Sequence, residues 1–305
     1  MRIAILGAGG VGGHYGGTLA RAGYPVSLLA RGANLEALRT RGLTVTSPDG
    51  TFTVAVTAAP DARGLGPADL AIVSVKCYSL PEVLPAARLL AEGGATVLPL
   101  LNGVEAADRL VSGGVPRERV LGGLTQISAA RVAPGVFERR SSFQRVSVGE
   151  LSGGVSERAR RVAELFRAAG AEADASEDIV ADLWRKLAFI ASMAAACGLA
   201  RAPVGPVREA PYGRLLFERA VAEVYAVARA RGIAVGGDDA EKTLRFVDSL
   251  APGTAPSFLL DLRAGGPNEL EDLSGAVSRL GRASGIETPI HDTATAALAA
   301  SGRAG

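Results

Sequence analysis

The first residues that can take part in chemistry are glycines near the start of the chain. Gly7, Gly9 and Gly12 form G-x-G-x-x-G in "RIAILGAGGVGG", directly after a strand-like run and at the start of a helical pattern. Such glycines permit a tight turn, close approach of a pyrophosphate to the backbone, and close packing of helix on strand. The N–H groups and dipole of a helix N-terminus favour an anion. The pattern predicts a dinucleotide site, the alternative being a glycine-rich turn without a ligand.

The residues of this loop expected to contact the dinucleotide are Gly7, Gly9, Gly10, Val11 and Gly12. The additional glycines of the helix are more typical of close packing against a sheet, and they are Gly13, Gly16 and Gly17.

The second predicted strand, "PVSLLAR", ends with a basic residue. An NAD-binding chain places Asp or Glu about twenty residues after the glycines, for the ribose 2′-hydroxyl, whereas this sequence reads Ala30-Arg31. A guanidinium there can form bidentate, charge-assisted bonds with a 2′-phosphate, and the strand end carries no carboxylate to repel it. Arg31 therefore favours NADP over NAD. The alternative is a solvated charge at the strand end.

Lys186 is the residue best suited to proton chemistry. It lies in "LWRKLAF", a strongly apolar helical segment where an ammonium is costly unless it is paired or lines a cleft. An ammonium can stabilise and protonate the alkoxide that forms when hydride reduces a ketone. Taken alone, a lysine on a helix is more often solvated or snorkelling.

The elements that would position these residues differ between the two halves of the chain. Strand-like runs at 2–7, 25–31, 68–76 and 94–103 alternate with helical patterns, which indicates βαβ units and a parallel sheet. Residues 42–50 and 51–57 alternate in period two around Pro-Asp-Gly and predict a hairpin. Further strands are expected within 119–128 and 143–150, followed by a helix at 156–170.

From about Asp178 the pattern is helical. Apolar residues recur at intervals of three and four in the segments 177–200, 213–232, 238–250, 268–285 and 288–300. We predict an α/β fold with an N-terminal Rossmann-type dinucleotide-binding domain over residues 1–177, followed by an all-helical substrate domain over residues 178–305.

Several motifs together resemble those of the ketopantoate reductase family. They are "GAGGVG" with Arg31, "VSVKCYS", "LLNGVE", "LWRKLAF" and "PSFLLDLRAGGPNELEDLSG", in the order and approximate spacing of that family over nearly the whole chain. The resemblance implies NADPH-dependent reduction of 2-dehydropantoate (ketopantoate) to pantoate, a step of pantothenate biosynthesis.

The resemblance also implies roles for particular residues. Lys186 would protonate the substrate oxygen, Glu269 would orient Lys186 or bind a substrate hydroxyl, and Ser257 would contact substrate. Lys76 and Asn102 would line the nicotinamide end of the site and contact both cofactor and substrate. Without the resemblance, Glu269 reads as a surface carboxylate on a helix, Ser257 as a helix cap and Asn102 as part of a turn.

The sequence departs from the family where substrate specificity is expected. Asparagines stand four and eight residues after the lysine in the family, but here these positions are Ile190 and Ala194, and Ser274 replaces another asparagine. An apolar wall at Ile190 and Ala194 favours a less polar substrate. Three functions therefore remain open: ketopantoate reduction, reduction of a less polar 2-oxoacid or ketone, and a catalytically silent NADP-binding sensor.

The composition excludes several classes of partner and site. The formal net charge is only +2, which argues against nucleic acid as the main partner. Cys77 and Cys197 fit no metal spacing, so no metal site is expected. The longest apolar run, residues 187–199, is shorter than the roughly 20 residues of a membrane span, and no signal peptide is evident. We expect a cytoplasmic protein without membrane partners and regard a homodimer as plausible.

Overall fold

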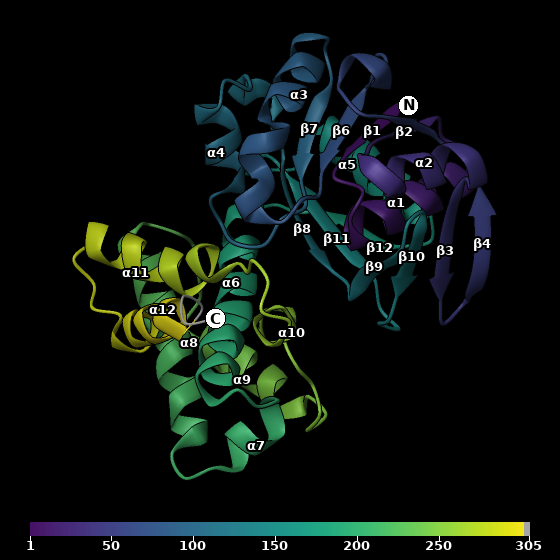
Figure 1. Ribbon diagram of the computed structural model, residues 1–305. Coiled ribbons are helices and arrows are strands. Elements are labelled where there is room, and N and C mark those ends of the chain that lie inside the picture. Colours follow the sequence, from purple (N-terminus) through teal and green to yellow (C-terminus); the bar gives the residue numbers. More distant parts are fainter. Residues whose placement is uncertain (302–305) are drawn as a thin grey trace. The chain divides into compact units, whose positions relative to one another are not determined.

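The structure, a computed structural model, describes residues 1–301 and divides into two compact units (Figure 1). The first unit comprises Met1–Leu101 and Glu105–Ile179, and the second comprises Asn102–Val104 and the chain from Val180 onward. The division at 179/180 lies two residues beyond the one expected from sequence, and the Asn-Gly turn at 102–104 groups with the second unit.

A parallel sheet of order β5-β2-β1-β6-β7 forms the centre of the first unit, as the alternating pattern predicts. Its strands are β1 (Ile3–Leu6), β2 (Val26–Leu29), β5 (Thr57–Ala59), β6 (Leu70–Val73) and β7 (Thr96–Pro99). Every residue of β1, β2 and β6 is buried, because helices cover both faces of the sheet. Strand β5 was not expected as a separate strand.

The helices of the first unit are α1 (Gly10–Arg21), α2 (Gly32–Arg41), α3 (Leu80–Glu92), α4 (Ala106–Ser112) and α5 (Glu157–Ala168). One face of the sheet, represented by Ile5 and Leu28, shares a core with α1 and α5. The opposite face, represented by Leu6 and Val73, shares a core with α3 and α4.

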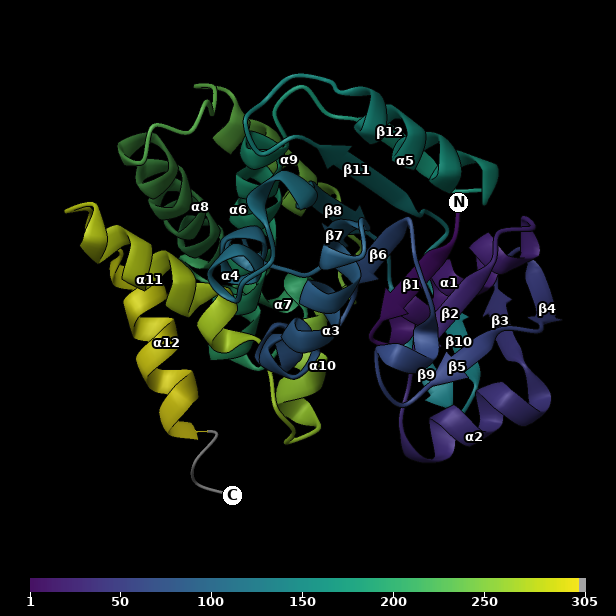
Figure 2. The same cartoon turned by 90° about the horizontal axis from the view of Figure 1, so that it is seen from above.

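Two smaller sheets complete the first unit (Figure 2). The first has the order β4-β3-β10-β9, with β3 (Leu43–Ser47), β4 (Gly50–Val54), β9 (Ala129–Ala133) and β10 (Val136–Arg139). The second has the order β12-β11-β8, with β8 (Gly122–Gln126), β11 (Arg145–Gly149) and β12 (Glu172–Ala175). The β3–β4 hairpin and strands β8 and β11 confirm the sequence prediction. Strands β9, β10 and β12 were missed because β9 and β12 consist mainly of alanine and charged residues, which are uncommon in strands, and β10 has only two adjacent apolar residues.

Helix α1 fits between strands because two of its faces carry glycine. A Cβ atom at Gly13 would overlap the ring of Phe137 on β10. A Cβ atom at Gly17 would lie 2.5 Å from side-chain atoms of Leu43 and Val45 on β3, whereas one at Gly16 would lie 3.3 Å from Ile5 of the parallel sheet. The extra glycines of α1 therefore serve packing, as their pattern predicts.

This packing yields a matched pair of substitutions on α1. Gly13→Ala should lower the free energy of unfolding by roughly 1–3 kcal/mol, because the new methyl overpacks against Phe137. Gly16→Ala should cost less, since its nearest neighbours lie at 3.3–3.4 Å and alanine is the better helix former. Denaturant unfolding measures the free energy of unfolding of both variants. A Gly13→Ala variant as stable as Gly16→Ala, or more stable, would contradict the packing described here.

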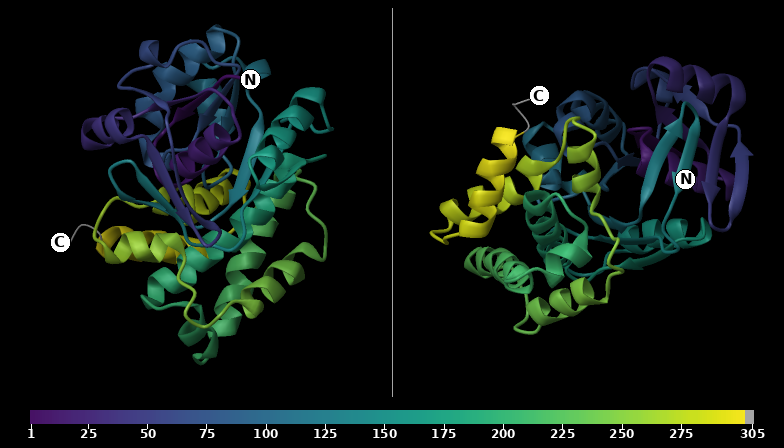
Figure 3. Two further views of the ribbon diagram at one scale, coloured as in Figure 1. Left: turned by 90° about the vertical axis from the view of Figure 1, so that its right-hand side faces the viewer. Right: turned by 60° about the horizontal axis from the view of Figure 1, so that its bottom comes forward.

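The second unit is built from seven helices among the described residues (Figure 3). They are α6 (Ile179–Ala200), α7 (Val204–Glu209), α8 (Gly213–Ala230), α9 (Asp239–Ser249), α10 (Ser257–Arg263), α11 (Ser274–Ala283) and α12 (Pro289–Ser301). Helix α6 contributes to two apolar cores, one shared with α8, α10, α11 and α12 and the other with α7, α8, α9 and α10. The all-helical character of this unit confirms the prediction.

One helix predicted from sequence is wrong in its first turns. The segment 268–285 begins with a 3₁₀ turn at Leu270–Asp272, and α11 starts only at Ser274. The break lies at Leu273, whose φ of −107° and ψ of −98° are not helical. Glu269 therefore lies in an irregular segment before the helix, not on its surface.

Helix α6 confirms the helical segment expected at 177–200, and it is apolar over most of its length. With 22 residues and a mean hydropathy of 1.3, it meets the length and composition of a membrane span. However, 61% of that apolar window is buried inside the protein, as in a core helix.

Candidate active site

The glycine-rich loop between β1 and α1 has the geometry of a dinucleotide cradle. Gly7 has a φ of +114°, and a Cβ atom there would lie 2.6 Å from Val75 Cγ1. A Cβ atom at Gly12 would overlap the carbonyl oxygen of Gly7, so helix and loop pack without space for one. At Gly9 a Cβ atom would meet only the Ser74 carbonyl oxygen, at an ordinary contact distance of 3.9 Å, so protein atoms do not crowd this face of the loop. Together with the N–H groups of the first turn of α1, this open face fits a pyrophosphate.

Gly10 has a packing role that the sequence did not indicate. A Cβ atom at Gly10 would overlap the carbonyl group of Ala129 on β9. A glycine is therefore required there whether or not a ligand binds, and a contact of Gly10 with the dinucleotide would be made by its backbone. Val11 is half-buried and packs against the core of the first unit.

The charge at the end of β2 is not isolated, contrary to the sequence-based expectation. Arg31 Nη1 donates a hydrogen bond of 3.0 Å to Glu82 Oε2 in the first turn of α3. Glu82 lies 51 residues further along the chain, so no local pattern places a carboxylate near Arg31. In the parallel sheet, the segments that follow β2 and β6 emerge at the same edge, on either side of β1, and this brings the two side chains together.

The start of α2 is held against the glycine-rich loop by Asn34, a residue that sequence reasoning missed. The buried Asn34 amide donates to the Ala8 carbonyl at 3.3 Å and accepts from the Gly135 N–H at 2.8 Å. Because Ala8 lies between Gly7 and Gly9, these bonds fix the backbone of Arg31, the N-cap of α2, relative to the cradle.

In the second unit, three predicted site residues form one hydrogen-bonded chain. Lys186 Nζ donates to Asn102 Oδ1 at 3.1 Å, and Asn102 Nδ2 donates to Glu269 Oε2 at 3.0 Å. The ammonium can only donate and the ionised carboxylate can only accept, so this orientation of the amide is chemically required. The chain therefore couples a cation to an anion through a single side chain.

Local structure places each member of this chain. Asn102 follows β7 in an Asn-Gly turn, where Gly103 has a φ of +84° and a Cβ atom would lie 2.9 Å from the Asp272 carbonyl oxygen. The turn thus packs directly on the 3₁₀ segment that carries Glu269. Glu269 is only 3% exposed, which overturns its reading as a surface carboxylate.

The two apolar replacements lie in different surroundings on α6. Ile190, one turn after Lys186, is half-buried against the core of the second unit. Ala194 is 1% exposed and belongs to that core. Of the two, Ile190 is the residue with surface available to a ligand.

Two further predicted residues, Ser257 and Lys76, are carried by other elements. Ser257 is exposed and is the first residue of α10, whose N-cap is Pro256. Lys76 belongs to the first unit, where it is half-buried at the carboxyl end of β6 and caps the 3₁₀ turn Cys77–Ser79. This edge of a parallel sheet is where ligands usually bind.

Ser274 belongs to a buried polar network around His291. The His291 ring is fully buried, with Nε2 3.0 Å from the Ala220 carbonyl oxygen and Nδ1 3.2 Å from the Ser274 hydroxyl. Since a carbonyl only accepts, Nε2 carries the proton and Nδ1 accepts from Ser274. Burial lowers the pKa of His291 to about 4, so the ring is neutral at neutral pH.

This network predicts acid sensitivity of the second unit. The unfolded chain binds a proton at His291 below about pH 6.5 and the folded chain only near pH 4. The free energy of unfolding should therefore fall as the pH drops from about 6.5 to about 4, by up to about 3 kcal/mol. Denaturant unfolding of wild type and of His291→Gln between pH 4 and 6.5 tests this prediction. The free energy of unfolding should depend less steeply on pH in the variant. Glu223, whose pKa is raised by burial, is common to both proteins. Identical slopes would contradict the assignment.

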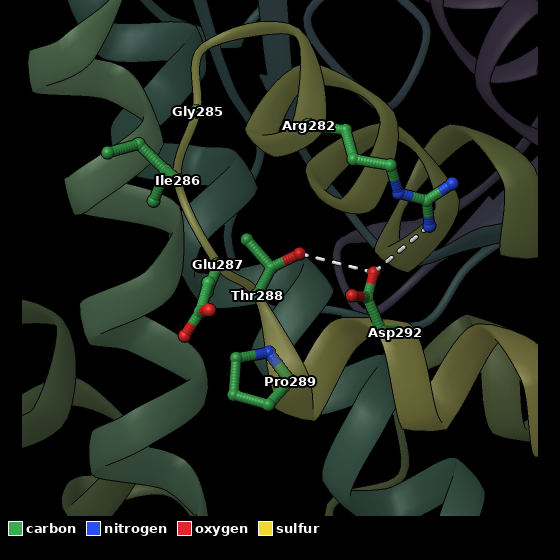
Figure 4. A pocket seen from close by; sticks show the side chains of 7 residues that line it. All are labelled: Arg282, Gly285, Ile286, Glu287, Thr288, Pro289 and Asp292. Atoms are coloured by element: carbon green, nitrogen blue, oxygen red, sulfur yellow. Dashed lines mark hydrogen bonds and ion pairs between the residues drawn. The ribbon is translucent and has the colours of Figure 1, made fainter.

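An open pocket lies at the N-terminal end of α12. It has a volume of about 480 Å³ and is lined by Arg282, Gly285, Ile286, Glu287, Thr288, Pro289 and Asp292 (Figure 4). The Asp292 carboxylate accepts from the Thr288 hydroxyl at 3.2 Å and from Arg282 at 3.5 Å, so these three side chains are paired with one another. No site residue predicted from the sequence lines it.

The fold and these side chains define a nicotinamide-dependent oxidoreductase with a Rossmann-type unit and a helical unit. Comparison with known proteins supports this class. The family profile "Ketopantoate reductase PanE/ApbA" matches residues 3–153, and "Ketopantoate reductase PanE/ApbA C terminal" matches residues 178–301. The chain belongs to the ketopantoate reductase family, whose members are NADPH-dependent reductases.

Individual relatives match over almost their whole length. The chain is 34% identical over 294 residues to a 2-dehydropantoate 2-reductase of Halobacterium salinarum, covering 95% of each. It is 30% identical over 301 residues to the uncharacterized oxidoreductase YkpB of Bacillus subtilis, covering 98% of each. A crystal structure of 2-dehydropantoate 2-reductase from Geobacter metallireducens superimposes with a TM-score of 0.91 at 28% identity, covering 99% of this chain and all of the other.

Proposed function

We propose that the protein reduces a 2-oxoacid to the 2-hydroxyacid with NADPH, that ketopantoate is this substrate, and that Lys186 is the general acid. The observation that carries the proposal is the hydrogen-bonded chain from Lys186 through Asn102 to the buried Glu269. A binding protein needs only the dinucleotide cradle, so this chain in the helical unit argues against a silent sensor.

The use of lysine supports a proton-transfer role. Of the 33 Lys and Arg residues only three are lysines, namely Lys76, Lys186 and Lys242. Arginine supplies nearly every other positive side chain, yet a guanidinium does not release its proton in proteins. A lysine is the cation that can act as an acid, and two of the three stand at predicted site positions.

In the proposed mechanism, the dinucleotide is held by Gly7, Gly9, Gly10, Val11, Gly12 and Arg31, with Lys76 and Asn102 at its nicotinamide end. When bound it supplies hydride to the carbonyl carbon of the substrate. Lys186 donates a proton from Nζ to the carbonyl oxygen as negative charge develops there. Asn102 orients the ammonium, and the Glu269 carboxylate favours its protonated form between turnovers.

Replacing Lys186 tests this role. Lys186→Arg keeps the positive charge but removes the proton donor, so kcat should fall roughly 10²–10⁴-fold. The NADPH dissociation constant should change little. Lys242→Arg is the matched control, because Lys242 is paired with Asp238 on the surface of α9. Activity of Lys186→Arg equal to that of the control would exclude Lys186 as the acid.

A less polar 2-oxoacid is the second candidate substrate, and Ile190 favours it. Its half-buried side chain stands one turn from Lys186, where the resemblance implies an amide, and an apolar surface does not satisfy a substrate hydroxyl.

Steady-state kinetics on ketopantoate and a series of alkyl and aryl 2-oxoacids separate the two substrates. Ile190→Asn should raise kcat/KM for ketopantoate relative to the less polar acids by roughly tenfold or more. Ala194→Asn is a contrasting variant, because an amide in the core should lower stability without this selective gain. An unchanged ratio in Ile190→Asn would remove Ile190 from the specificity site.

A homodimer and a cytoplasmic location stay predictions from the sequence.

A further inference from the structure

The contact between Arg31 and Glu82 places a carboxylate where the 2′-phosphate of NADPH is expected. We propose that Glu82 is a specificity-determining residue of the dinucleotide site, which weakens binding of the 2′-phosphate and accepts a hydrogen bond from the ribose 2′-hydroxyl of NADH. The inference rests on the proposed role of Arg31 in cofactor binding. It predicts a smaller preference for NADPH over NADH than Arg31 alone would produce.

The position of Glu82 is fixed by the fold. Its helix, α3, follows the Cys77–Ser79 turn after β6, the immediate neighbour of β1 in the sheet. Arg31 follows β2, the neighbour of β1 on the other side, and Asn34 ties the start of α2 to the glycine-rich loop. The Arg31 and Glu82 side chains thus meet at the carboxyl edge of the sheet, beside the cradle, where the adenosine ribose of a Rossmann-bound dinucleotide lies.

Both side chains are available to a ligand. The Arg31 side chain is 64% exposed and that of Glu82 is 58% exposed, while their ion pair uses only one of the five N–H donors of the guanidinium. A phosphate can therefore occupy the free edge of Arg31, but it must then share one cation with a carboxylate. Glu82 and the phosphate repel each other across a few ångströms.

The same geometry suits a hydroxyl. A ribose 2′-OH is a donor, and an ionised carboxylate is the acceptor that NAD-binding chains place at this point. Here the carboxylate comes from α3 instead of the end of β2. Glu82 can accept this hydrogen bond while keeping its contact with Arg31, so NADH leaves no charge unpaired.

Such an exposed ion pair contributes little to folding, typically about 1 kcal/mol or less. The Glu82→Gln variant should consequently fold normally, and the substitution should change only the affinities for NADPH and NADH. Glu92→Gln is the matched control, because Glu92 lies at the other end of α3 and is paired with Arg88 at 3.7 Å.

The experiment is equilibrium titration of the protein with NADPH and with NADH, without substrate, by quenching of Trp184 fluorescence or by calorimetry. In Glu82→Gln the ratio of the NADH to the NADPH dissociation constant should rise roughly three- to tenfold, and the rise should shrink at high salt. Glu92→Gln should leave the ratio unchanged. An unchanged ratio in Glu82→Gln overturns the proposal. A lower ratio also overturns it, because it would mean that Glu82 holds Arg31 in place for the phosphate.

Arg31→Ala separates this inference from the assignment on which it rests. If Arg31 binds the 2′-phosphate, this variant should weaken NADPH roughly 10- to 100-fold and NADH much less. Loss of NADPH affinity in Arg31→Ala with no effect of Glu82→Gln would overturn the role of Glu82 alone. If Arg31→Ala binds NADPH as wild type does, the assignment of Arg31 is overturned together with the proposal.

Discussion

The close approach of α1 to the strands on both of its sides is the constraint on which the first unit depends. Gly13 packs against β10 and Gly17 packs against β3. Gly12 packs against the loop after β1, and Gly16 faces the parallel sheet. Any larger side chain at Gly12 or Gly13 would displace the helix, because the space is already filled by backbone or by an aromatic ring. The same packing aims the N-terminus of α1 at the open face of Gly9, so the glycines that hold the fold together also form the dinucleotide cradle.

The helical unit carries a cation, Lys186, on the apolar helix α6, and this charge needs a polar partner. Lys186 is tolerated on α6 because Asn102 accepts its hydrogen bond and links it to Glu269. Asn102 is connected in sequence to β7 of the first unit, yet it groups with the second. One three-residue turn thus supplies the helical unit with the amide that pairs its lysine.

Arg31 and Glu82 form an ion pair of opposite charges at the carboxyl edge of the parallel sheet. In sequence, Arg31 stands alone at a strand end and favours a phosphorylated cofactor. In the folded unit it is paired with Glu82, and our proposal therefore assigns cofactor preference to two residues of opposite charge.

The fold class, the parallel strands and most of the helices could be predicted from the sequence, because continuous apolar runs and three-to-four periodicity report burial directly. The sequence also indicated the glycine-rich cradle and Lys186, whose chemistry is local. Strands β9 and β12 were missed because alanine and charged residues dominate them, β10 because it has only two apolar residues, and the helix of α11 was extended back through Glu269. Tertiary packing is what buries Glu269 and Ala194, leaves Ile190 partly accessible and brings Glu82 to Arg31. The physical reason is that burial and charge pairing across 51 or 167 residues depend on strand order and helix packing, which no local pattern encodes.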